Sequence, residues 1–89
     1  EIKLLDGEVR PPIQGVVSMQ VSGQMAVLKT LPGFANSVAV KIDEKELPEL
    51  MGTIAGNDTI LMIIKDGVGK DKLLNAVGSH FPELLEILI

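Results

Sequence analysis

A predicted β-hairpin over residues 51–65, with the sequence MGTIAGNDTILMIIK, constrains the fold of this chain more than any other stretch. Residues 60–64 form an unbroken apolar run with β-branched members, which is typical of a strand buried on both faces. The apolar run before it is separated from it by Gly56, Asn57 and Asp58. These residue types adopt turn conformations at low cost, so the pattern predicts two strands joined at a short tip.

A second hairpin is expected earlier in the chain. Residues 15–21 alternate in polarity as a half-buried strand does, with Val17, Met19 and Val21 predicted on one face. The turn Ser22-Gly23-Gln24 follows, and residues 25–30 are more continuously apolar, which indicates a strand deeper in the sheet.

One helix should follow each hairpin. An apolar stripe repeating every four residues predicts a helix over about 33–43. A second helix is expected over about 70–78, ended by Gly78, with a terminal turn or two over about 82–88. The order β-β-α-β-β-α predicts an α/β (α+β) two-layer sandwich, in which two helices pack on one face of a four-stranded sheet.

The chain has the length of one domain, with 89 residues. Residues 1–12 contain the pair Pro11-Pro12, which favours an extended backbone, so they are interpreted as a linker. Residues 13–89 are interpreted as the domain itself.

The composition predicts association. Apolar residues make up 46% of the chain, although it has two Phe and no Trp or Tyr. A chain so short cannot bury all of these side chains, so an exposed apolar patch and an oligomer are expected.

Charge and residue usage argue against several functions. The net charge is −4, and the eight basic residues are scattered, so this part of the protein is expected to bind nucleic acid poorly. The chain has no Cys and one His, so neither thiol chemistry nor a metal cluster is expected. Its apolar runs are too short to cross a bilayer, and a soluble cytoplasmic domain is expected.

Catalytic motifs are also missing from the sequence. It contains no nucleophile motif, no zinc-protease motif and no phosphate-binding glycine loop. His80 is the one histidine of the sequence, and beside a predicted helix break it is interpreted as a surface or capping residue. A non-enzymatic domain without a cofactor is expected.

Two stretches resemble the C-terminal domain of the bacterial arginine repressor family. The first is the strand-to-helix junction LKTLPG at 28–33, and the second is the hairpin GTIAGNDT at 52–59. The resemblance extends over about 16–88. It implies the same β-β-α-β-β-α order, L-arginine as effector, and trimers that pair into a hexamer with the ligands between them. Operator DNA would be bound by a separate N-terminal winged helix-turn-helix domain that lies outside this chain.

The resemblance also implies a set of ligand-binding residues. Carried over by position, these are Asn36, Asp43, Thr53, Ala55, Asn57 and Asp58. The chemistry agrees, because a guanidinium has five donors in a planar fork and is held best by carboxylates. Asp43 and Asp58 would accept from the two cationic groups of arginine, and Ala55 would offer its backbone. The amide of Asn36 and the hydroxyl of Thr53 would help to satisfy the ligand carboxylate.

The sequence departs from the family pattern at two of these positions. Asn36 replaces the usual Gln, which shortens the reach and keeps the chemistry. Asn57 replaces the usual Asp, and the lost charge should weaken a contact to arginine across the trimer interface, since charge-assisted hydrogen bonds contribute about 1.5–3 kcal/mol.

Two alternative functions remain open at this stage. One is an oligomerisation domain that has lost its effector, which the substitution at Asn57 would allow. The other is a small trimeric enzyme subunit with its active site between subunits. The turn residues Asn57 and Asp58, the acid Asp43 and the strand residue Thr53 also have ordinary structural roles, because such residues are common in turns, helix ends and strands.

Overall fold

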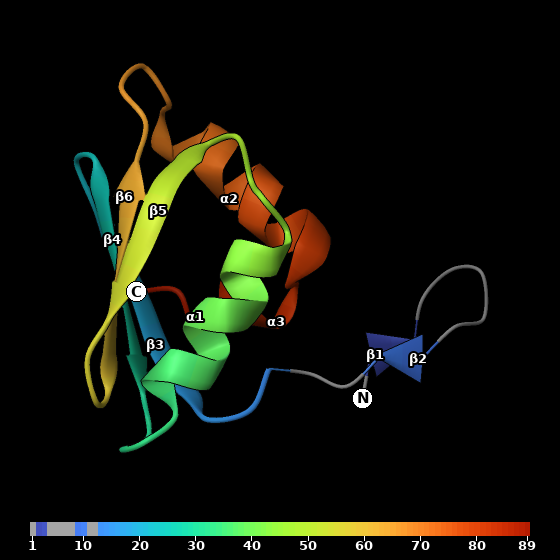
Figure 1. The fold of residues 1–89 in the computed structure, drawn as a ribbon. Helices are drawn as coiled ribbons and strands as arrows, with labels where there is room; N and C mark the ends of the chain where they lie inside the picture. The colour runs from blue at the N-terminus through green and yellow to red at the C-terminus, as the bar shows by residue number, and fades with distance from the viewer. Residues whose placement is uncertain (1, 4–8, 11–12) are drawn as a thin grey trace.

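A four-stranded antiparallel sheet forms one layer of the molecule, and helices form the other (Figure 1). The computed structural model describes residues 2–3, 9–10 and 13–89. The sheet has the spatial order β3-β4-β6-β5, so the second strand of each hairpin is central. The strands are β3 (Val16–Ser22), β4 (Met25–Thr30), β5 (Leu50–Ala55) and β6 (Thr59–Ile64).

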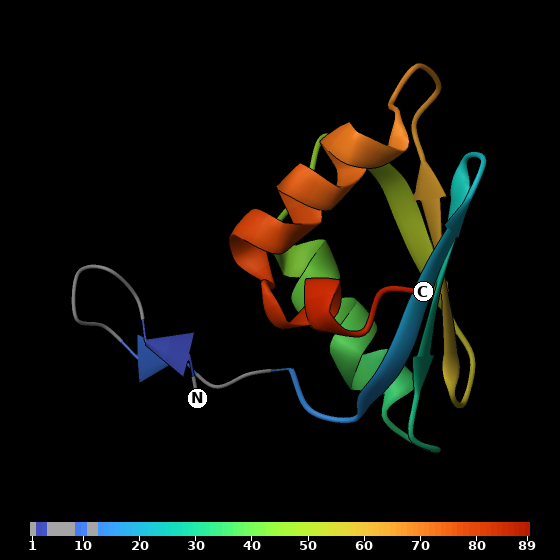
Figure 2. The same cartoon turned by 180° about the vertical axis from the view of Figure 1, so that it is seen from behind.

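The helices of the described part of the chain all lie on one face of this sheet, as the reverse view also shows (Figure 2). They are α1 (Ala35–Glu44), α2 (Lys70–His80) and α3 (Glu83–Glu86). The predicted two-layer sandwich and its element order are therefore confirmed, and α3 corresponds to the predicted terminal turn.

The central strand β6 has one buried face only. Ile60, Met62 and Ile64 point toward the helices and are buried, whereas Leu61 and Ile63 are only half-buried. Within a single chain, the prediction of a strand buried on both faces is therefore wrong. An unbroken apolar run indicates burial on both faces only if both faces are covered, and here the helices cover one.

The opposite face of the sheet is apolar across three strands. Met25 is 51% exposed and Ile54 is 62% exposed, and Val27, Leu61 and Ile63 are half-buried between them. Cross-strand pairing joins these side chains, because Met25 pairs with Ile63, and both Val27 and Ile54 pair with Leu61. We call these five residues the open face. They fit the expected exposed apolar patch.

Strand β3 contains an irregularity that the alternating pattern did not predict. The register shifts between Val16 and Ser18, so one extra residue is accommodated there. Beyond the shift Met19 is fully buried, while Val17 is 52% exposed and Val16 packs against the core. The prediction that Val17 shares a face with Met19 is therefore wrong, because a bulge displaces the two-residue alternation by one position.

Helix α1 begins two residues later than predicted. Gly33 has φ +86°, a left-handed conformation that cannot continue into a right-handed helix, so the first helical residue is Ala35. The predicted apolar stripe is confirmed, since Ala35, Val38 and Ile42 are buried against the sheet.

Helix α2 extends past Gly78 to His80, so the prediction that Gly78 ends it is wrong. A Cβ at Gly78 would lie 2.6 Å from a methyl carbon of Leu85, so the glycine permits close packing of α3 against α2. The helix ends before Pro82, as the sequence predicts, and His80 is its last residue.

The two ends of the chain add short pairings. Ile2–Lys3 (β1) and Val9–Arg10 (β2) form a two-stranded antiparallel ladder within the segment interpreted as a linker, and Pro11 and Pro12 lie outside the described residues. At the other end Leu88 forms a parallel bridge with Met19 on the edge of β3. In the described part of the molecule, no helix is both long enough and apolar enough to cross a membrane.

The fold predicts a strong effect of a methyl group at Gly15. This residue has φ +87°, and a Cβ there would lie 2.5 Å from ring carbons of Phe34. Gly15→Ala should lower the free energy of unfolding by about 2–4 kcal/mol, because backbone strain and overpacking add. Gly23→Ala is the matched control, since Gly23 has φ +59° and no atom near its Cβ position. Urea denaturation at equal protein concentration measures both, and equal losses would contradict the role of the Phe34 contact.

Candidate functional site

The residues implied as ligand contacts lie along one seam, where α1 packs against the edge strand β5. Asn36 and Asp43 are seven residues apart on α1, which places them on one face of the helix, about 10 Å apart along its axis. Thr53 and Ala55 are two residues apart on β5, so both point to the same face of the sheet, the face that carries α1. The predicted residues of α1 and of β5 thus lie along the contact between this helix and this strand.

Asp43 and Thr53 are in direct contact at one end of the seam. The hydroxyl of Thr53 lies 2.9 Å from Oδ1 and 3.1 Å from Oδ2 of Asp43, so it donates to the carboxylate. A threonine hydroxyl has one proton, and here that proton is directed to Asp43. Thr53 therefore orients this carboxylate in the structure, while the outer lone pairs of Asp43 stay available to a ligand.

The hairpin tip is attached to the junction before α1 at the other end of the seam. The backbone N–H of Gly33 is shared by two acceptors of Asn57, its carbonyl oxygen and its side-chain Oδ1, each at 3.0 Å. The N–H of Thr30 donates to the carbonyl of Asp58 at 2.8 Å. The tip between β5 and β6 and the segment before α1 accordingly lie at the same end of the molecule in Figure 1.

These contacts give Asn57 a structural role. Its side-chain oxygen accepts from Gly33, so the residue fixes the tip against the loop that starts α1. Its amide hydrogens remain as donors, and the oxygen retains a second lone pair. Asp58 has an exposed side chain, and its Oδ1 accepts from the Thr59 hydroxyl at 3.0 Å.

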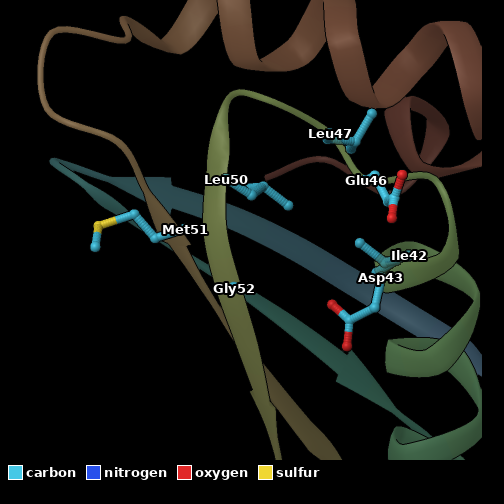
Figure 3. Close-up of a pocket in the computed structure, with 7 residues that line it drawn as sticks. All are labelled: Ile42, Asp43, Glu46, Leu47, Leu50, Met51 and Gly52. Carbon is cyan, nitrogen blue, oxygen red and sulfur yellow. The ribbon is translucent and has the colours of Figure 1, made fainter.

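A small cavity of about 120 Å³ opens at the Asp43 end of the seam (Figure 3). Figure 3 shows the carboxylates of Asp43 and Glu46 on the α1 side of this cavity, while the side chain of Met51 points away from it. The remaining lining is mostly apolar. The lining residues are Ile42, Asp43, Glu46, Leu47, Leu50, Met51 and Gly52.

The structure groups the predicted residues into two clusters along the seam. Asp43 and Thr53 form the cluster beside the cavity, and Asn57 and Asp58 form the cluster at the tip. Asn36 lies in the first turn of α1, three residues after the Gly33 amide that binds the tip. Ala55 lies on β5 between the clusters.

Sequence reasoning did not identify several neighbours of these clusters. Gly33 and Thr59 belong to the two stretches that carry the family resemblance, so their joint occurrence was a usable signal for a contact between the stretches. Glu46 had no such signal. It lies two residues after the last residue of α1 and has a left-handed backbone with φ 48°, which the sequence pattern did not predict.

Comparisons with known proteins identify the family of this chain. The model of the family "Arginine repressor, C-terminal domain" matches residues 13–78. The arginine repressor of Bacteroides thetaiotaomicron is 41% identical over 70 residues, covering 79% of this chain and 45% of the relative. That of Carboxydothermus hydrogenoformans is 49% identical over 70 residues, covering 79% and 44%.

A shorter match with the arginine repressor of Solibacter usitatus is 64% identical over 42 residues, covering 47% of this chain and 29% of the relative. The matches thus cover less than half the length of each of these relatives. The family model, by contrast, covers most of the domain. The matched residues include α1, β5 and the two stretches at 28–33 and 52–59 that carry the resemblance. The chain therefore belongs to the arginine repressor C-terminal domain family.

Proposed function

We propose that this domain senses L-arginine for a transcriptional repressor and assembles into an oligomer when it does so. The observation that carries the proposal is the seam between α1 and β5, which presents an oriented carboxylate, Asp43, near one end and an exposed carboxylate, Asp58, at the other. The names of the relatives support arginine as the effector.

The chemistry of arginine fits two separated carboxylates. Its guanidinium and its α-ammonium are two cationic groups at opposite ends of a flexible chain, and each pairs with a carboxylate by charge-assisted hydrogen bonds. Asp43 and Asp58 supply these acceptors. Asn36 and the amide hydrogens of Asn57 are the remaining donors for the ligand carboxylate, because the Thr53 proton is directed to Asp43.

The seam of one chain is an incomplete site. A cavity of about 120 Å³ is below the roughly 300–1,000 Å³ of typical small-molecule sites, so one copy encloses only part of an amino acid. Asp58 at the tip is exposed. A second copy facing the seam would complete the enclosure, which supports trimers paired into a hexamer with arginine between them.

The open face supplies a second surface for assembly. Its apolar side chains, led by Met25 and Ile54, lie on the side of the sheet opposite the helices, away from the seam. Burial of such a face within a trimer leaves the seam available for the contact between trimers.

Operator binding belongs to a different part of the protein in this proposal. The chain matches less than half the length of its relatives, and its net charge of −4 does not favour contact with DNA phosphates. An N-terminal winged helix-turn-helix domain would bind the operator in the cytoplasm, and arginine-linked assembly of this domain would control that binding.

One observation favours a second candidate, an oligomerisation domain without an effector. Asn57 lacks the charge of the usual Asp, and its side-chain oxygen is already used by Gly33. In this alternative Asn57 and Asp58 serve the hairpin turn alone. The following two experiments separate the candidates.

The first experiment titrates the domain with L-arginine and L-lysine in a calorimeter. Arginine should bind more tightly, because a point ammonium cannot fill a bidentate carboxylate contact. Asp43→Asn should weaken arginine binding about 10- to 150-fold, the range for a lost charge-assisted hydrogen bond. Asp66→Asn is the matched control, since Asp66 lies in the loop after β6 and its replacement can still accept from Gln24. Equal affinities for arginine and lysine, or an unaffected Asp43→Asn variant, would contradict the proposed site.

The second experiment restores the charge at the tip with Asn57→Asp. The new carboxylate still accepts from the Gly33 amide, so the fold is kept while a negative charge is added. Arginine binding should tighten, and sedimentation velocity should show a shift from trimer to hexamer when arginine is present. Without arginine the added charges should loosen the hexamer, most at low salt. An unchanged affinity together with an unchanged mass would show that residue 57 only forms the turn.

A further inference from the structure

A chain of two hydrogen bonds connects the sheet to the hairpin tip. The ammonium of Lys29 donates to the hydroxyl of Thr59 at 2.9 Å, and that hydroxyl donates to Oδ1 of Asp58 at 3.0 Å. Lys29 and Thr59 are direct cross-strand partners at the end of the β4–β6 ladder. These two hydrogen bonds therefore run from the sheet face that lies opposite the helices to a carboxylate of the candidate arginine site.

The direction of both hydrogen bonds is fixed by the chemistry of the groups. A lysine ammonium can only donate, so the Thr59 oxygen must be the acceptor from Lys29. An ionised carboxylate can only accept, so the single hydroxyl proton must go to Asp58. A donor that is itself polarised by a cation makes a stronger hydrogen bond, since consecutive bonds polarise one another.

We infer that Lys29 and Thr59 are positioning residues that hold the Asp58 carboxylate in one orientation before the ligand binds. The inference rests on the proposed function, because it assigns two further residues to the same arginine site. In this role Thr59 and Lys29 act through Asp58 and need not touch arginine themselves.

The main chain of Asp58 is fixed by the surrounding structure, but the orientation of its side chain is not. Its main chain is already held, because its carbonyl accepts from the N–H of Thr30 at 2.8 Å. Its side chain is exposed and would otherwise rotate freely. Thr59 is half-buried, and its hydroxyl is held between the Lys29 ammonium, from which it accepts, and the Asp58 carboxylate, to which it donates. Fixing the carboxylate in advance lowers the entropy lost on binding.

Lys29 has two opposing effects on a cationic ligand. It directs the Thr59 proton toward Asp58, which favours binding, and its charge repels arginine, which opposes binding. Salt separates them, because the Debye length falls from about 10 Å at 0.1 M to about 3 Å at 1 M. The repulsion is screened at high salt, while the effect of side-chain orientation remains.

The test measures arginine affinity by calorimetry for four variants at low and high salt. Thr59→Val removes the hydroxyl at nearly constant shape and should weaken binding about two- to tenfold at both salt concentrations. Thr59→Ser keeps the hydroxyl and should restore binding to within about twofold of the original. Lys29→Met should weaken binding more at high salt than at low salt. Lys65→Met is the control for loss of one positive charge, since Lys65 lies in the loop after β6.

A second measurement, the ¹³C NMR resonance of the Asp58 carboxyl group, needs no ligand. The ¹³C resonance of the Asp58 carboxyl should move in Thr59→Val and Lys29→Met, and should stay in place in Thr59→Ser and Lys65→Met. If the unaltered protein does not bind arginine, the proposed function fails, and this resonance still tests the positioning contacts. An Asp58 resonance that is unaffected in Thr59→Val, or arginine binding that is unchanged in that variant, would overturn the inference.

Discussion

The hydrogen bonds between the hairpin tip and the junction before α1 determine where the candidate ligand groups at one end of the seam lie. One N–H, that of Gly33, is shared by the carbonyl and side-chain oxygens of Asn57, and a second, that of Thr30, holds the carbonyl of Asp58. These bonds fix the β5–β6 turn against the start of α1. Asn36 and Asp58 are therefore held at one end of the seam, while the Thr53 hydroxyl holds Asp43 at the other.

Because helices cover only one face of the sheet, the domain has two surfaces for the proposed assembly. These are the open face, for the trimer, and the seam, for the contact between trimers. The helices bury one side of the sheet and leave the open face uncovered, while the strand order places β5 at the edge of the sheet beside α1. The carboxylate of Asp43, oriented beside a cavity too small for a whole amino acid, supplies half of the proposed site. In the proposed function, assembly and effector binding both follow from this architecture, and each should promote the other.

The sequence predicted the elements and their order, because apolar periodicity and turn residues are local signals. It failed where a local pattern has two structural outcomes. The alternation around Val17 cannot reveal a bulge, and the position of Gly78 inside α2, packed against Leu85 of α3, is a contact between two helices that the local pattern does not show. The candidate residues came from the family resemblance. The bond between Asp43 and Thr53, and the chain from Lys29 through Thr59, depend on strand register and helix packing, which the sequence pattern alone does not specify.

Backbone amide NMR during a titration with L-arginine tests the central claim most directly. The claim is that arginine binds along the seam between α1 and β5. It predicts saturable shifts at the amides of Gly33, Thr53 and Asn57, with the amides of the α2 residues 71–76 unchanged. No shift at saturating arginine, or shifts confined to α2 and α3, would contradict it.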